Sequence, residues 1–171
     1  KGKHWVLWNA QELLALSDEP PRFWDDETMK LVPLDTIRWY CGVEVHKKVL
    51  VLALYGIYLQ NPVLGPILMF ETDHAGYQKL KDTITPFQPH RFLLETTGVY
   101  HFMVVWHLEQ NFPTAQVCVM NSFDVAKYLK RTRKSDKVDA IRLSQLARYD
   151  ELLKKSYCPT QSRARLREYA R

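Results

Sequence analysis

The chain has 171 residues, 46% apolar side chains and a net charge of +5, which predicts one domain with a substantial core. It has no apolar run long enough to span a bilayer, so we expect no membrane association. Its three cysteines are scattered, which argues against a disulfide framework or a zinc site and favours a reducing, cytoplasmic location.

Positive charge is concentrated in the last third of the chain. Residues 121–171 contain 14 Lys and Arg against 6 Asp and Glu, whereas residues 1–120 contain 10 against 13. A basic excess confined to one region indicates a polyanionic partner such as nucleic acid. A solvated helical face is the common alternative for such a run.

Residues 1–37 differ in composition from the rest of the chain. They contain Trp5, Trp8 and Trp24 and a turn-rich segment. We interpret them as an N-terminal extension of unknown role whose aromatic side chains pack on a domain formed by residues 38–171. A partner-binding arm is the alternative.

An alternating series of strands and helices follows the extension. The predicted strands are 37–45, 49–55, 66–71, 90–95 and 115–120. The predicted helices are 75–84, 99–110, 122–130 and 137–149, with a further one at 163–169. A strand meander followed by crossover units predicts an α/β fold with a mixed five-stranded sheet flanked by helices.

Four carboxylates lie at the ends of these elements: Glu44, Glu95, Asp136 and Asp139. Glu95 directly follows the apolar run 92–94 in a predicted central strand, where an isolated charge is costly to bury. Asp136 and Asp139 are three residues apart and therefore share one face of a helix. Gathered together, such hard oxygen ligands repel one another and suit Mg²⁺ or Mn²⁺.

Each acid also has an ordinary structural interpretation. Asp136 could cap the helix, and Asp139 could favour the positive end of the helix dipole. Glu44 could face solvent from its strand and pair with His46 or Lys47. The four acids meet only if the first and fourth strands of the domain are neighbours in the sheet.

A basic segment comes immediately before the two aspartates. Lys127, Lys130, Arg131 and Lys134 recur at helical spacing, with Arg133 among them. A phosphate-binding face beside a metal site is what nuclease-like chemistry requires. A solvated surface helix is again the alternative.

Three motifs together resemble the DEDD transposases of bacterial insertion sequences, which are related to the Piv DNA invertases. The motifs are GVEVHK at 42–47, LETTGVY at 94–100 and SDKVDA at 135–140. The resemblance covers about 37–171 and implies a ribonuclease H-like (RuvC-like) fold. It also implies that Glu95, Asp136 and Asp139 correspond to the second, third and fourth acids of a divalent-metal site.

Glu44 departs from that family pattern, which has Asp at the first position. Its extra methylene moves the carboxylate by about an ångström, whereas Mg²⁺ demands near-ideal geometry. The resemblance further implies a C-terminal domain with a catalytic serine, which residues 1–171 do not show. It also implies DNA as partner, a structured guide RNA in some members, and a homo-oligomer for the full-length protein.

The expected function is therefore that of a DNA transposase or site-specific recombinase domain. Its chemistry would be divalent-metal-dependent DNA strand cleavage and transfer, with the four acids as catalytic metal ligands. One rival is a nucleic-acid-binding module derived from such an enzyme, with impaired catalysis. The other is a RuvC-like junction nuclease that acts alone.

Overall fold

A mixed five-stranded sheet forms the centre of the protein, in the order β5-β4-β3-β6-β7. The computed structural model describes residues 22–25, 30–128, 135–150 and 160. The strands are β3 (Arg38–Val45), β4 (Val49–Tyr58), β5 (Asn61–Glu71), β6 (Arg91–Glu95) and β7 (Gln116–Met120). Strands β3 to β5 form an antiparallel meander, and β6 and β7 run parallel to β3. This topology confirms the predicted ribonuclease H-like sheet.

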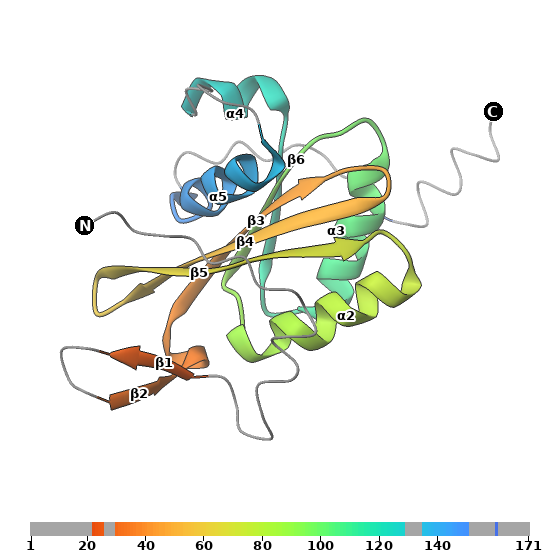
Figure 1. Cartoon of the computed structure of the whole chain (residues 1–171). Coiled ribbons are helices and arrows are strands. Elements are labelled where there is room, and N and C mark those ends of the chain that lie inside the picture. Colours follow the sequence, from red (N-terminus) through yellow and green to blue (C-terminus); the bar gives the residue numbers. More distant parts are fainter. Residues whose placement is uncertain (1–21, 26–29, 129–134, 151–159, 161–171) are drawn as a thin grey trace, which may run out of the picture.

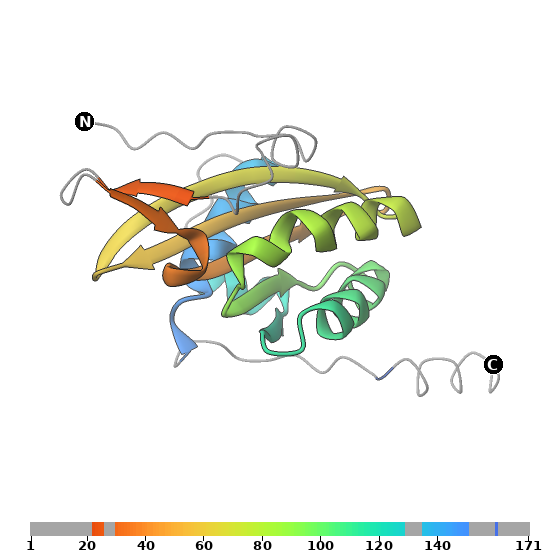
Figure 2. The same cartoon turned by 90° about the horizontal axis from the view of Figure 1, so that it is seen from below.

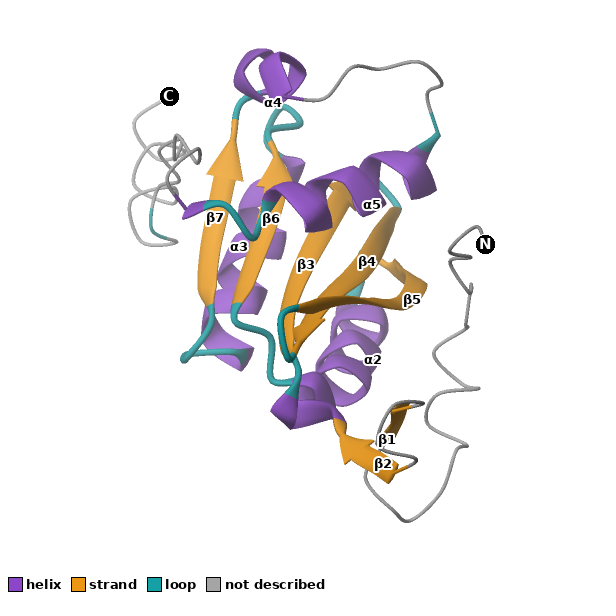
Figure 3. Ribbon diagram, turned by 90° about the vertical axis from the view of Figure 1, so that its left-hand side faces the viewer, coloured by secondary structure: helices purple, strands orange, loops and turns teal. Residues whose placement is uncertain are grey.

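Helices cover both faces of this sheet. They are α2 (His74–Ile84), α3 (Tyr100–Asn111), α4 (Ser122–Tyr128) and α5 (Asp136–Leu146), with short 3₁₀ helices η1 (Leu34–Thr36) and η2 (Thr85–Phe87). Helices α2 and α3 lie side by side on one face (Figure 2), and α5 crosses the other (Figure 3). Of the helices in the described ranges, none is long and apolar enough to cross a membrane.

Side-chain alternation along the strands builds a core on each face of the sheet. Trp39, Cys41 and Val43 of β3 pack in the larger core with residues of α2 and α3. Tyr40 of β3 packs instead in the smaller core with Leu143 of α5. Because successive strand residues point to opposite faces, each face of β3 serves one helix layer.

The hairpin between β4 and β5 is longer than the sequence predicted. The strands continue to Tyr58 and restart at Asn61, with Leu59 and Gln60 at φ of 46° and 66°. Two consecutive left-handed residues give the tight turn that matches strand twist. The prediction was wrong here because neither residue is Gly or Asn, and because prolines argue against a strand. Pro62 is tolerated since β5 is an edge strand.

Helix α5 begins one residue earlier and ends three residues earlier than predicted. Ser135 is its N-cap and its Oγ accepts a hydrogen bond from the Val138 N–H at 3.2 Å. The interpretation of Asp136 as the helix cap is therefore wrong. Helix α4 is described only to Tyr128, so the rest of the predicted helix 122–130 and all of 163–169 lie outside the described residues.

The N-terminal part contains two strands that the sequence did not predict. β1 (Arg22–Asp25) and β2 (Lys30–Pro33) pair antiparallel and lie at the end of the main sheet opposite α4 (Figures 1 and 3). Trp24 lies on β1, whereas Trp5 and Trp8 lie outside the described residues. Leu34 belongs to the core, and its carbonyl accepts a hydrogen bond from Trp39 Nε1 at 2.8 Å. This contact ties the segment after β2 to the sheet.

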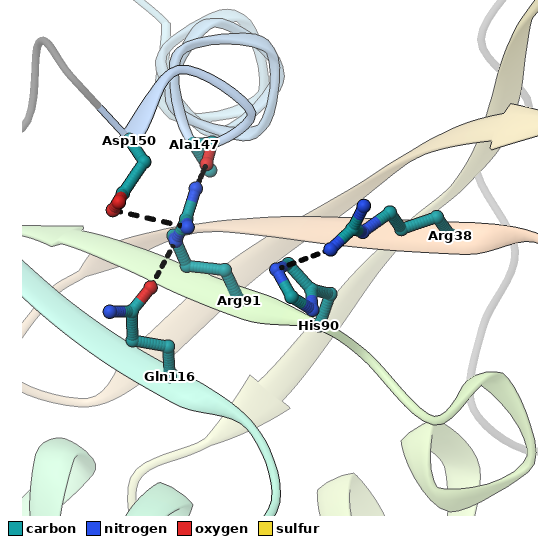
Figure 4. Close-up of polar contacts among 6 residues, drawn as sticks. All are labelled: Arg38, His90, Arg91, Gln116, Ala147 and Asp150. Atoms are coloured by element: carbon teal, nitrogen blue, oxygen red, sulfur yellow. Dashed lines mark hydrogen bonds and ion pairs between the residues drawn. The ribbon is translucent and has the colours of Figure 1, made fainter. Parts of the chain in front are cut away.

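A buried arginine fixes the C-terminal end of α5 to the sheet. The Arg91 guanidinium donates from Nε to Gln116 Oε1 and from Nη1 to the Ala147 carbonyl, each at 2.6 Å. Its Nη2 lies 3.1 Å from Asp150 Oδ1, and the side chain is 6% exposed. Figure 4 shows these contacts beside the pair formed by Arg38 and His90 at 3.1 Å. Arg91 therefore joins β6, β7 and the end of α5.

Candidate functional site

Glu44 and Glu95 are brought together by the pairing of β3 with β6. The two strands are parallel, with Val43 beside Leu94, so the next pair in this register is Glu44 beside Glu95. Since Val43 and Leu94 face the larger core, alternation places both glutamates on the face covered by α5. Two acids far apart in the chain thus lie on adjacent strands and on the same face.

The backbone of α5 lies directly on β3 at Gly42. A Cβ atom at this position would meet the Ala140 carbonyl oxygen at 2.1 Å and the Ser144 nitrogen at 2.2 Å. Any side chain here would therefore push the helix off the sheet. Because Asp139 immediately precedes Ala140, this close approach carries Asp139 over the end of β3. A glycine inside a strand pattern signals such an approach, and the sequence interpretation overlooked it.

Three of the four predicted carboxylates line one pocket of about 480 Å³. They are Glu44, Glu95 and Asp139. Glu95 is 8% exposed and Asp139 is 6% exposed, while Glu44 is half-buried. The other lining residues are Val45, His46, Lys47, Thr96, Thr97, Gly98, Tyr100 and Ser122. The pocket therefore combines buried acids with one exposed lysine at its rim.

Asp136 lies beside this pocket rather than in its lining. Its side chain is 52% exposed, and its Oδ1 lies 3.2 Å from His46 Nε2. His46 itself lines the pocket. Asp136 therefore reaches the pocket of the other three acids only through its contact with His46.

The acids share a pocket without forming a compact coordination sphere. Among the described residues, no three His, Cys, Asp or Glu side chains form a group that could hold a metal ion. Asp139 is held by Arg142, whose Nη1 lies 3.9 Å from Oδ1. The donors are nonetheless all carboxylate oxygens, the ligands that Mg²⁺ and Mn²⁺ take.

The loop after β6 is built to hold the pocket wall in place. The Thr96 N–H donates to the Met120 carbonyl at 2.9 Å, and the Thr97 N–H donates to His101 Nδ1 at 3.3 Å. Burial lowers the pKa of His101, which favours the neutral ring that can accept this bond. Gly98 has a φ of +56°, a left-handed conformation that glycine adopts readily and that turns the chain into α3.

Only the start of the predicted basic face lies within the described residues. Lys127 is exposed, its Nζ lies 2.7 Å from Asp124 Oδ1, and it sits 4.9 Å from the centre of the Phe123 ring. Its charge is therefore partly compensated within α4. The other four residues of the face lie outside the described residues: Lys130, Arg131, Arg133 and Lys134.

The chain is similar to solved resolvase structures at low sequence identity. RuvC of T. thermophilus in complex with Holliday junction substrate is 12% identical, with a TM-score of 0.44 over 63% of this chain and 90% of that chain. The fowlpox virus Holliday junction resolvase is 16% identical, with a TM-score of 0.47 over 66% and 98%. No curated protein sequence matches the chain. These similarities are too distant to assign individual residues.

A family match covers most of the chain. The family model of DEDD transposases of the IS110 type, described as Transposase, matches residues 41–171. The matched range begins within β3 and contains all four carboxylates. Transposases cleave DNA strands and join them at new positions, so the matched range carries a DNA cleavage and recombination function. The chain belongs to the IS110-type DEDD transposase family.

Proposed function

We propose that Glu44, Glu95 and Asp139 hold a divalent cation, Mg²⁺ or Mn²⁺, where this transposase domain cleaves DNA. The observation that supports the proposal is the shared pocket, in which two of the three acids are almost fully buried. Like charges buried together are unfavourable unless a cation compensates them. Carboxylate oxygens are also the preferred ligands of these two ions.

The protein groups around the acids suit a phosphodiester substrate. A cation held there supplies charge neutralisation at the phosphate and activation of the attacking oxygen. Lys47 is exposed and lines the same pocket, so its ammonium can contact a DNA phosphate next to the one that reacts. Because Glu95 lies on a central strand, its carboxylate is fixed by the sheet and needs little ordering when DNA binds.

Asp136 acts from the rim in this proposal. His46 holds its carboxylate beside the pocket at 3.2 Å, and the carboxylate can turn inward as a fourth oxygen ligand. Asp136→Asn should therefore weaken metal binding less than Asp139→Asn, because Asp136 starts exposed and outside the pocket lining. Equal losses in the two variants, measured by Mn²⁺ titration, would contradict this difference in role.

The test of the proposed function is metal-dependent nicking of DNA. Glu95→Gln keeps the shape of the side chain and removes its charge, and should lower the nicking rate about a thousandfold if several kcal/mol of transition-state stabilisation depend on the metal. Glu71→Gln is the matched control, since Glu71 also ends a strand but is exposed on β5. Nicking that needs no metal, or that survives Glu95→Gln, would show that the acids do not form the active site.

A binding module with impaired catalysis is the second candidate. It is favoured by the contacts of Asp136 with His46 and of Asp139 with Arg142, which hold these acids without metal, and by Glu44 in place of the family's Asp. In this case DNA binding should persist in EDTA and no nicking should occur with Mg²⁺ or Mn²⁺. Nicking restored by Glu44→Asp alone would identify the longer side chain as the defect.

We further infer a cytoplasmic protein that acts as a homo-oligomer on DNA, with a structured guide RNA where the full-length protein uses one. Cys41 and Cys118 are buried free thiols, and burial raises the pKa of Cys41 well above its usual value, so both suit packing in a reducing compartment. Light scattering of the full-length protein, with and without structured RNA, tests the oligomer and the guide. A monomeric protein that does not bind the RNA would contradict both the homo-oligomer and the guide RNA.

A further inference from the structure

A second pocket lies at the other end of α5, on the same face of the sheet. It measures about 370 Å³ and has an unusual lining of tyrosines and arginines. We call it the tyrosine pocket; its lining residues are Tyr55, Tyr128, Arg142, Gln145, Leu146, Arg148 and Tyr149. None of these residues lines the carboxylate pocket, and Arg142 contacts Asp139, which does.

Arg148 is held in this pocket by aromatic rings. Its guanidinium lies 5.8 Å from the centre of the Tyr55 ring and 4.4 Å from that of Tyr149. Its Nη1 also donates to the Tyr55 hydroxyl at 3.2 Å. Within the described part of the chain, no carboxylate forms an ion pair with Arg148. Within these residues its positive charge is therefore positioned by the rings and not paired with an acid, which is a favourable arrangement for an anion beside an aromatic surface.

The tyrosine pocket adjoins the carboxylate pocket through a single side chain. Arg142 lines the tyrosine pocket, and its Nη1 lies 3.9 Å from Oδ1 of Asp139, which lines the carboxylate pocket. From Asp139 to Leu146 the helix rises about 10 Å, at about 1.5 Å per residue. Stacked nucleotides of one strand are spaced by about 3.4 Å. One strand can thus reach both pockets within about three nucleotides.

We propose that the tyrosine pocket binds an unstacked base of the DNA strand whose phosphate lies at the carboxylate pocket. Tyr128 and Tyr149 are 40% and 44% exposed and can stack on the base, while Arg142 and Arg148 contact the flanking phosphates. Aromatic stacking combined with arginine–phosphate contacts is how proteins hold single strands. The proposal rests on the proposed function, because it names the strand that the cleavage site would act on.

The competing interpretation is that these rings only pack the end of α5. In that case Tyr149 would matter for stability and not for DNA, and its effect would not depend on the sequence position of any base. The two interpretations separate when affinity and unfolding are measured on the same variants.

The main test is binding of a single-stranded DNA oligonucleotide by the full chain in EDTA, where no cleavage occurs. Tyr149→Ala should bind about tenfold more weakly, in the range expected for one lost base stack, and Tyr149→Phe should bind like the wild type. Met103→Ala is the control, since Met103 is an exposed apolar residue on α3, on the opposite face of the sheet. Equal affinity of Tyr149→Ala and wild type would overturn the proposal.

A second test uses a series of oligonucleotides, each with one abasic site at a different position. A role of Tyr149 in packing alone cannot make the affinity depend on that position. Wild type should lose about tenfold in affinity at one position, and Tyr149→Ala should lose nothing further there, because base and ring form one interaction. Additive losses at every position would overturn the proposal even if Tyr149→Ala binds weakly or is less stable. A larger position-specific loss with RNA of the same sequence would overturn the assignment to DNA.

The arginines are tested through the salt dependence of the same binding. Arg148→Gln should reduce the slope of log affinity against log salt by about 0.7, the value for one phosphate contact on a single strand. Lys79→Gln, an exposed charge on α2, should leave the slope unchanged. Equal slopes for the two variants would remove Arg148 from the proposal. Loss of nicking in Glu95→Gln with unaltered Tyr149→Ala would leave the proposed function standing and overturn only this pocket.

Discussion

At its N-terminal end α5 places Asp139 in a pocket and Asp136 beside it, whereas the residues that follow its C-terminal end are bound to the sheet through Arg91. Among the described residues, the aspartate side chains form ion pairs of 3.2 Å from Asp136 to His46 and 3.9 Å from Asp139 to Arg142. At the other end Arg91 donates two hydrogen bonds of 2.6 Å and pairs with Asp150 at 3.1 Å. One end is thus held by a buried arginine that contacts both Ala147 and Asp150, and the other by two ion pairs of 3.2 and 3.9 Å.

This difference indicates a division of labour along one helix. Charged hydrogen bonds inside a protein contribute more than neutral ones, so the Arg91 end contributes to stability. The aspartate end keeps carboxylate oxygens available at the cost of burying Asp139. Sites of function commonly give up local stability in this way. Gly42 lies between the two ends and sets the distance of the whole helix from β3.

The largest expected effect comes from Gly42→Ala, which disturbs both ends at once. The new Cβ would lie 2.1 Å from the Ala140 carbonyl oxygen, and backbone atoms cannot move aside as a side chain can. We expect a loss of about 3 kcal/mol in unfolding free energy or more, and loss of Mn²⁺-dependent nicking because Asp139 moves. Denaturant unfolding and nicking assays measure the two effects. Lys79→Ala is the control, since Lys79 is an exposed residue of α2 on the opposite face of the sheet. Nicking retained by Gly42→Ala would show that the close approach does not position the site.

Arg91→Met should damage only the C-terminal end. It removes one buried and one part-buried charge-assisted hydrogen bond but keeps most of the side-chain volume, so we expect a loss of about 2 kcal/mol in unfolding free energy. Nicking by the remaining folded protein should stay near the wild-type rate. Arg38→Met, which removes only the exposed contact with His90, should cost less than about 0.5 kcal/mol. A comparable loss of nicking in Arg91→Met would mean that the two ends are not independent.

Divalent metal should stabilise the aspartate end alone. At a Mn²⁺ concentration about ten times its Kd, binding only to the folded state adds about 1.4 kcal/mol, or roughly 3–5 °C in Tm for a chain of this size. Arg91→Met should show the same increase, whereas Glu95→Gln should show none. Glu44→Asp should enlarge the increase if the extra methylene weakens the site. Thermal unfolding with Mn²⁺ or EDTA measures this, and a Tm indifferent to Mn²⁺ would favour the binding module.

The smallest effect is on pH dependence, and both ends contribute. Burial lowers the pKa of His101, and burial together with Arg38 and Arg91 lowers the pKa of His90. A histidine with a lowered pKa binds fewer protons in the folded state, so its stabilisation is complete above the ordinary pKa of about 6.5 and is lost as pH falls below it. Each histidine contributes at most about 1.4 kcal/mol per pH unit.

His90→Gln and His101→Gln should each flatten the loss of unfolding free energy below about pH 6.5. Above neutrality, where these rings are neutral in both states, the difference between each variant and the wild type should not change with pH. A residual slope is expected from His107, whose pKa is lowered by burial and by His74. Unchanged slopes in both variants would contradict the assignment of the pH dependence to these two rings.

The order of strands and helices could be predicted because the local pattern of apolar and polar residues indicates each element. The runs 90–95 and 115–120 are apolar on both faces and became β6 and β7. The helices predicted at 75–84 and 99–110 became α2 and α3, and each end lies within one residue of the prediction. Where local chemistry was atypical, as at the Leu59–Gln60 turn, the prediction was wrong because the sheet imposed a conformation that those residues rarely adopt.

The sequence by itself determined which acids are present, their order and their places at element ends, because hydrophobic pattern and residue chemistry are local properties. Only the tertiary structure decided that Glu44 lies beside Glu95, since that depends on the parallel register of strands separated by 45 residues. It also decided that the backbone of α5 packs directly on Gly42, that His46 contacts Asp136, and that Arg91 binds the residues after the C-terminal end of α5. Each of these is a contact between segments far apart in the chain, where packing and not local preference determines the neighbour.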